Sequence, residues 1–234
     1  MRLLSYNENQ SMKDYIYKTL KYNIMCLLLK PGDRISESEL QKIFNASKSP
    51  IRESLVKLKE EKLIDIFPQK GTFISKIDLN LVDDILFTRK VLENEILKIA
   101  VSSEKDKTLL LKKLKKNFDE TKISSLSCHS SEEVFLLLSL DKEFHETLFE
   151  FAGRKNIWEM ICSVGLHYER FRILETPEEE NISFIFEQHQ RIIDILEEKD
   201  EEKVKLIGEL HVSNFKSSFY SLFKKYPSYF INYC

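Results

Sequence analysis

The segment from residue 31 to residue 76 constrains the fold of this 234-residue chain more than any other part. It begins with a Pro-Gly turn, and Ser36 followed three residues later by Glu39 predicts a capping box at the start of a short helix. A second turn at Asn45-Ala46 leads into another helical pattern, whose first residues are small hydroxyls and cations. This arrangement predicts a helix-turn-helix, whose second helix suits the major groove of DNA.

Two β-like runs follow the helices, at Leu63–Phe67 and Thr72–Ser75, and a Pro-Gln-Lys-Gly connection joins them. The pattern predicts a hairpin, or wing, with Lys70 and Gly71 at its tip. The lysine is attracted to phosphate, and the bare backbone of the glycine can approach a phosphate or the minor groove. The segment as a whole predicts a winged helix-turn-helix that binds double-stranded DNA.

The charge of the chain is unevenly distributed. The formal net charge is −2, but residues 1–76 hold 14 Lys and Arg against 9 Asp and Glu, a net of +5, so the remainder carries −7. A positive first part suits a polyanionic partner, and an acidic second part is repelled by it. We therefore expect nucleic acid to contact only the first domain.

The same segment resembles the GntR family of bacterial transcription regulators. The family pattern runs PGxxLxExxLA, then VSRxPVRxAL, then a leucine at the strand and PxxG at the wing. Lys48 and Lys70 replace the usual arginines, which keeps the charge but loses the bidentate fork, and Lys62 replaces a glycine. The matching residues, in order, are Pro31, Gly32, Ile35, Glu37, Leu40, Ser47, Pro50, Ile51, Arg52, Leu55, Leu63, Pro68 and Gly71.

The resemblance implies a homodimer on a palindromic operator, because one recognition helix reads only a few base pairs. Arg52 is the strongest candidate for base reading, and its alternative is a surface ion pair with a carboxylate such as Glu53. Ser47 has a competing role as the cap of the helix. The residues that fall on DNA-contacting positions of the family are Ser47, Lys48, Ser49, Arg52, Lys70 and Gly71.

Beyond the wing, the chain shows helical patterns only. They predict an antiparallel bundle, with Ser124–Ser131 as an exposed loop and a further helix at Met12–Leu28 packed on the winged module. The expected fold is mainly α, with a winged helix-turn-helix domain at 1–77 and an all-helical domain at 78–234. The bundle helices are expected at about 80–102, 105–123, 132–152, 155–174, 177–198 and 201–224.

Four histidines recur every 22 residues, at His145, His167, His189 and His211. If each helix and its link take about 22 residues, each histidine lies near the middle of its own helix, and the four converge on one layer provided that they face inward. Asp141 shares a helical face with His145. Such a group suits a divalent transition metal, and the alternative is a set of histidines bonded to their neighbours at the edge of the core.

The second domain resembles the FCD ligand-binding domain of the FadR subgroup. Metal-binding members have an Asp-x-x-x-His, a later Glu-x-His and a last histidine, which Asp141, His145, His189 and His211 match in order. The resemblance implies a bound metal, Zn, Ni or Mn, with open coordination positions that a small organic-acid effector fills. One turn departs from the family, since the usual Gly-Asn reads Gly153-Arg154 here.

An Arg-x-x-x-Glu near the start of the domain also matches, at Arg89 and Glu93. Arg89 offers the effector a charge-assisted hydrogen bond, and the alternative is an ion pair with Glu93 along the helix. His167 matches no ligand of the family, and we take it as a candidate pocket or effector-binding residue, with a plain core residue as the alternative.

These features predict a transcription regulator, commonly a repressor relieved by its effector, and not an enzyme. Two rivals stay open: a regulator with a metal-free pocket for an apolar or acyl ligand, and a helical-bundle metalloenzyme. Paired Glu-x-x-His motifs and Gly-rich phosphate loops are missing from the sequence, which disfavours the enzyme. Without an apolar run that could cross a bilayer, a secretory signal or a CxxC pair, we expect a cytoplasmic protein with reduced thiols and no membrane partner.

Overall fold

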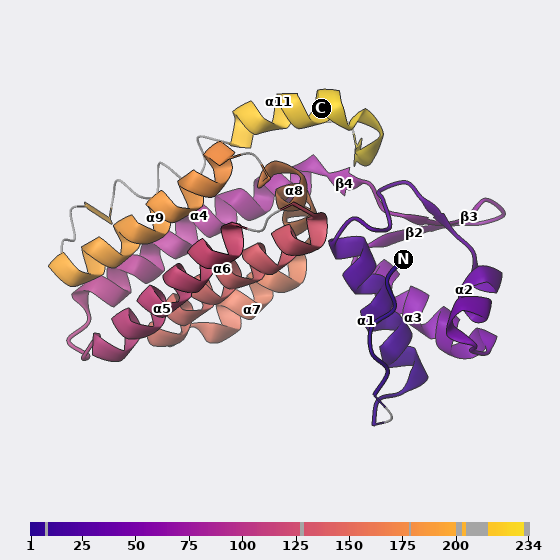
Figure 1. Cartoon of the computed structure of the whole chain (residues 1–234), viewed down its shortest axis with the longest axis horizontal. Coiled ribbons are helices and arrows are strands. Elements are labelled where there is room, and N and C mark those ends of the chain that lie inside the picture. The colour runs from indigo at the N-terminus through magenta and orange to yellow at the C-terminus, as the bar shows by residue number, and fades with distance from the viewer. Residues whose placement is uncertain (8, 127–128, 178, 200–202, 205–214, 232–234) are drawn as a thin grey trace. The chain divides into compact units, whose positions relative to one another are not determined.

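The computed structural model describes the chain except for residues 8, 127–128, 178, 200–202, 205–214 and 232–234 (Figure 1). The chain forms two compact units, one of Met1–Leu79 together with the C-terminal residues from Tyr226 on, and one of Asn80–Lys225. The C-terminal residues join the first unit because β5 (Phe230–Ile231) pairs in parallel with β4 (Ile77–Asp78). The sequence prediction placed the domain boundary at residue 77 and so assigned these C-terminal residues to the second domain. No local pattern in the sequence predicts a two-residue strand that pairs with a distant part of the chain.

The first unit has the winged helix-turn-helix that the sequence predicts. The buried faces of α1 and α3 pack together through residues such as Ile16, Leu20 and Leu58. The wing is an antiparallel hairpin, β2 and β3, and the three-stranded sheet has the order β1-β3-β2. The bounds are α1 (Met12–Met25), β1 (Arg34–Ile35), α2 (Glu37–Phe44), α3 (Lys48–Glu60), β2 (Ile64–Phe67) and β3 (Gly71–Ile74).

The turn between α2 and α3 forms as predicted, because Asn45 ends α2 in the left-handed conformation, with φ 46°. The capping box predicted at Ser36 is wrong. Ser36 is the residue before the helix, but its hydroxyl lies 2.8 Å from the hydroxyl of Ser38 and caps no backbone amide. A capping box does occur at the start of α6, between Ser130 and Glu133.

The second unit is helical throughout its described part. Its first long helix, α4, begins one residue before the unit does. The pattern at 155–174 predicted one helix, but the structure has two, α7 and α8, which meet at Gly165, a poor helix former. The helices are α4 (Leu79–Ser102), α5 (Thr108–Ser125), α6 (Ser131–Phe151), α7 (Lys155–Val164), α8 (Leu166–Glu175), α9 (Glu179–Glu198) and α11 (Phe215–Lys225).

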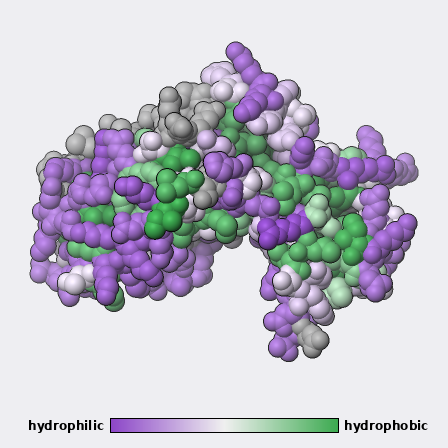
Figure 2. All heavy atoms as spheres, viewed as in Figure 1, coloured by the Kyte–Doolittle hydropathy of each residue, from purple (hydrophilic) through white to green (hydrophobic). Residues whose placement is uncertain are grey.

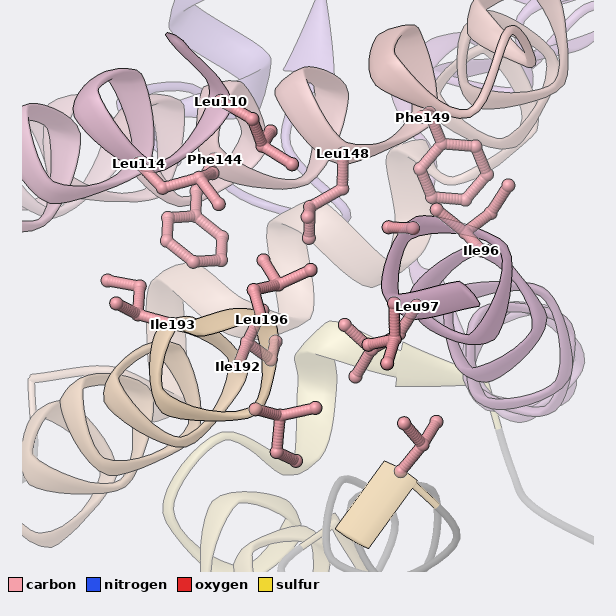
Figure 3. Packing of buried hydrophobic residues seen from close by; sticks show 14 of the residues in the cluster. Ile96, Leu97, Leu110, Leu114, Phe144, Leu148, Phe149, Ile192, Ile193 and Leu196 are labelled. Carbon is pink, nitrogen blue, oxygen red and sulfur yellow. The ribbon is translucent and has the colours of Figure 1, made fainter. Parts of the chain in front are cut away.

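The core of the bundle lies between α4, α5, α6 and α9 (Figure 3). Leu114, Phe144 and Leu196 are 0–1% exposed. This close-packed core excludes water and holds the polar residues beside it in fixed positions. Hydrophilic side chains cover much of the visible face of this unit (Figure 2). Among the described helices, none combines the length and apolar character that a bilayer span requires.

Candidate functional site

The recognition helix α3 presents its predicted DNA-contacting residues to solvent. Ser47 stands at the N-cap position, although its hydroxyl makes no capping hydrogen bond, and Lys48, Ser49 and Arg52 are exposed on the first turns. The partner of Arg52 is Glu37 on α2, with 3.1 Å between Arg52 Nε and Glu37 Oε2. Since Nε makes this contact, the terminal nitrogens of the guanidinium are left to face a ligand.

The surface ion pair that we weighed as the alternative for Arg52 does form, but with Glu37. Glu53 is engaged elsewhere. Its carboxylate accepts a hydrogen bond from the Ser49 hydroxyl at 2.9 Å and lies 3.6 Å from Lys13 Nζ. Glu37 also lies 4.0 Å from Lys48 Nζ, so a single carboxylate on α2 faces the two cations, Lys48 and Arg52, on the first turns of the recognition helix. Because the ion pairs of Glu37 with Lys48 and Arg52 are exposed, they add little stability, and their main effect is to orient the two cations.

At the tip of the wing, Lys70 is exposed between β2 and β3. Gly71 has φ +117°, which side-chain-bearing residues rarely adopt, and a Cβ there would come within 3.0 Å of Arg34 Nε. Glycine is therefore required by the backbone of the wing, whatever it contacts.

In the helical unit, three of the four predicted metal ligands converge. Asp141 and His145 of α6 and His189 of α9 place one ligand atom each within 4.8 Å of one another, and all three side chains are buried. Asp141 Oδ1 lies 3.3 Å from His189 Nε2. The His189 ring stacks on Phe144 with 3.8 Å between centroids, which fixes its orientation. The fourth candidate, His211, lies outside the described residues.

The surroundings of this group are ionic. Arg172 of α8 donates a hydrogen bond from Nη1 to Asp141 Oδ2 at 2.5 Å, so the two carboxylate oxygens face different partners. On α4, Arg89 Nε donates to Glu93 Oε1 at 2.5 Å, and Glu93 Oε2 lies 3.5 Å from His145 Nδ1. The ion pair between Arg89 and Glu93 that we weighed as an alternative does form.

Burial and neighbouring charges set the protonation states of these residues. Burial lowers the pKa of His145 to about 3, against a partial opposing effect of Glu93, so the imidazole is neutral near pH 7. Burial alone would raise the pKa of Asp141, but Arg172 and the two histidines hold it well below its usual value. Both Arg89 and Arg172 stay charged, because Glu93 and Asp141 raise their pKa values. The site thus has the neutral imidazole of His145 close to the ionised carboxylate of Asp141.

A cavity opens onto this group, and we call it the His pocket. Its empty volume is about 750 Å³, including open solvent at the mouth. His167 lines neither this pocket nor the second cavity considered below; it is buried with Nδ1 3.3 Å from Arg170 Nη2. The residues that line the His pocket include Arg89, Asp141, His145, Tyr168, Arg172 and His189.

Sequence reasoning missed Arg172 and Tyr168. Arg172 contacts Asp141 from 31 residues away, and the hydroxyl of Tyr168 accepts a hydrogen bond from Arg89 Nη1 at 3.1 Å. Tyr168 and Arg172 stand four residues apart on α8, so they share a face of that helix. The only available signal was this spacing within an amphipathic segment.

The winged helix-turn-helix and the helical unit together have the architecture of a two-domain, DNA-binding transcription regulator. The family described as "Bacterial regulatory proteins, gntR family" matches residues 12–74, and the family described as "FCD domain" matches residues 84–214. The chain belongs to the GntR family and carries an FCD domain, and it is a regulator, not an enzyme.

Relatives agree with this assignment. The chain is 32% identical over 185 residues to an "Uncharacterized HTH-type transcriptional regulator in unstable DNA locus" of Streptomyces ambofaciens, covering 79% of this chain and 75% of that protein. It is 27% identical over 212 residues to the "HTH-type transcriptional repressor RspR" of Escherichia coli (strain K12), covering 91% and 90%. The solved structure "E. coli McbR/YncC" has the same fold, with TM-score 0.67 at 18% identity over 91% of this chain and 99% of that one.

Proposed function

We propose that this regulator binds a palindromic operator as a homodimer and that a small carboxylate, bound with a divalent metal in the His pocket, controls its operator affinity. On the DNA side, the proposal assigns Arg52, Lys48, Ser47 and Ser49 to the major groove. Lys70 and Gly71 are assigned to the wing contact. The observation that carries the sensing half is the buried convergence of Asp141, His145 and His189 on an open pocket.

The donor set fits a divalent transition metal in chemistry and in spacing. An ion with ligand distances of about 2.1 Å holds its donors roughly 3–4 Å apart, so small side-chain rotations would bring Asp141, His145 and His189 into place. Binding requires neutral imidazoles, and the lowered pKa of His145 supplies one without a proton to displace. Family resemblance adds His211 as a fourth ligand, with Zn, Ni or Mn as candidate ions.

The ionic residues of the pocket explain why the effector would be an acid. Arg89 is balanced by Glu93, and Arg172 is balanced by Asp141, so the protein groups already neutralise one another. When bound, a divalent ion supplies Lewis acidity and surplus positive charge. Arg89, Tyr168 and Arg172 line the same pocket and offer hydrogen-bond donors to a carboxylate that restores the balance.

Control of DNA binding then requires that the effector bind one conformation of the regulator more tightly than the other. Repression relieved by the acid is the outcome that we propose. A metal-free pocket for an apolar or acyl ligand is the competing proposal, because the same pocket also has apolar walls at Leu86, Phe184 and Ile185.

Elemental analysis of purified full-length protein tests the metal. We expect about one ion per chain, reduced roughly tenfold or more in His189→Gln and unchanged in the matched control His129→Gln, whose side chain is exposed. Circular dichroism checks that the variant remains helical. Stoichiometric metal in His189→Gln would reject this ligand, and metal-free wild-type protein would favour the apolar-ligand alternative.

Operator affinity tests the effector. Fluorescence anisotropy with labelled operator DNA is measured across a panel of small carboxylic acids, before and after removal of metal by a chelator. We expect at least one acid to change the affinity only in the metal-loaded protein. An acid that changes the operator affinity equally in chelator-treated protein would show that sensing does not require the metal.

A further inference from the structure

A second cavity lies in the helical unit, and we call it the Trp cavity. Its empty volume is about 630 Å³, again including open solvent at its mouth. Helices α4, α6, α7 and α8 surround it, and no histidine is among its lining residues. Its walls are mainly apolar and aromatic, formed by Ile85, Phe135, Leu138, Trp158, Ile161 and Ile173.

A single layer of side chains separates the Trp cavity from the His pocket. Arg89, Asp141, Tyr168 and Arg172 line both. The guanidinium of Arg89 lies 5.5 Å from the centre of the Trp158 ring and 5.3 Å from that of Tyr168, so the layer is held by cation–π contacts as well as by ion pairs. The two cavities therefore share one wall of side chains.

The charged residues of the Trp cavity all have partners within the protein. Lys142 Nζ lies 3.1 Å from Glu169 Oε1 at the mouth, Arg172 is bonded to Asp141, and Arg89 is bonded to Glu93. An ionic ligand would have to separate one of these pairs, at a cost that its own contacts must offset. A neutral ligand leaves them intact and buries its apolar surface against the walls.

We propose that the Trp cavity is a second binding site, for a neutral apolar small molecule of aromatic or branched aliphatic character. Among the lining residues, the hydroxyls of Tyr168 and Ser139 can make polar contact with a neutral ligand. The site goes beyond the metal and carboxylate site and does not require it. Since an occupant touches Arg172, which holds Asp141, it is positioned to influence the His pocket through that side chain.

The chain contains one tryptophan, Trp158, and it lines this cavity and not the His pocket. Its fluorescence therefore reports on a bound probe directly. The probe is N-phenyl-1-naphthylamine, a neutral aromatic molecule that accepts energy from tryptophan. It is titrated into chelator-treated full-length protein, so that a bound metal ion does not contribute. Ser139 lines the Trp cavity and not the His pocket, so a variant at this position tells the two cavities apart.

Ser139→Tyr places a bulky side chain at the mouth of the cavity. Ser139 is exposed and its hydroxyl bonds only the Phe135 carbonyl of its own helix, so the fold does not depend on it. Ser163→Tyr is the matched control, since Ser163 is also exposed, bonds the Met160 carbonyl of its own helix and does not line the cavity.

We expect saturable energy transfer from Trp158 in the wild-type protein and in Ser163→Tyr, with one probe per chain. In Ser139→Tyr the affinity should fall by about tenfold or more. Absence of saturable transfer in the wild type overturns the proposal. Equal affinity in Ser139→Tyr and Ser163→Tyr also overturns it, because the probe would then bind elsewhere.

Discussion

Replacing His145 by glutamine should remove a large part of the acid sensitivity of the helical unit. His145 is 1% exposed, and burial lowers its pKa from 6.5 to about 3. The folded protein therefore keeps the imidazole neutral at pH 5, while the unfolded chain takes up a proton below about pH 6.5. The unfolded state binds more protons, so stability falls as the pH drops through 6.5 and continues to fall towards 3.

The magnitude follows from the distance between pH 5 and the unfolded pKa. That distance is about 1.5 pH units, and each unit is worth about 1.4 kcal/mol, so His145 costs the folded state about 2 kcal/mol at pH 5 relative to pH 8. The side chain is almost fully buried, so solvent screening does not reduce this value appreciably. Other groups titrate too, and only the difference between wild type and variant isolates His145.

The assay is urea unfolding of chelator-treated protein at about pH 8 and about pH 5, followed by the fluorescence of Trp158, which belongs to the same unit. We expect the wild type to lose about 2 kcal/mol more than His145→Gln on acidification. His129→Gln, an exposed control, should behave like the wild type. An equal loss in wild type and His145→Gln would refute the reasoning, and with it the neutral imidazole that the metal proposal uses.

Three further outcomes follow from the described contacts. Arg52→Ala should weaken specific operator binding by about 1–3 kcal/mol in an anisotropy titration, and unchanged affinity would mean that α3 does not read the groove. Lys70→Ala should reduce the magnitude of the slope of log affinity against log salt by about 2 at every sequence, because each subunit of the proposed dimer loses one phosphate contact, and a salt series measures this slope. Asp141→Asn should destabilise metal-free protein by roughly 3–5 kcal/mol, because Arg172 stays buried without its carboxylate, and the double variant Asp141→Asn/Arg172→Gln should recover part of this loss in calorimetry.

The first unit was predictable because its determinants are local. Asn45 adopts the left-handed conformation within one residue of the predicted turn, and the glycine of the wing needs a positive φ that few other residues tolerate. The helix-turn-helix and the hairpin are each built from contacts between neighbours in sequence. By contrast, β5 pairs with β4 across some 150 residues, and its two residues have no pattern of their own.

The helix caps show where prediction from the sequence fails in detail. Ser36 and Glu39 have the right types and spacing for a capping box, but the Ser36 hydroxyl turns towards Ser38 instead. The same residue types at Ser130 and Glu133 do form the box. Sequence locates the end of a helix, whereas the choice between two nearby hydroxyl partners depends on side-chain rotation that the pattern does not contain.

The candidate site depends on which face of each helix is turned inward. The 22-residue spacing of the histidines predicts only how far along its helix each histidine lies. His145 and His189 do meet, with 5.4 Å between ring centroids. His167 does not join them. Gly165 ends α7 and a separate helix, α8, begins, so the helical periodicity is not continuous from one helix to the next. On α8 the residues that line the His pocket include Tyr168 and Arg172, four apart on one face, while His167 is buried elsewhere. Successive residues of a helix differ by about 100°. A shift of one position therefore exchanges an imidazole for a phenol and a guanidinium at this wall. That exchange places Tyr168 and Arg172, and not a third imidazole, at the wall of the His pocket.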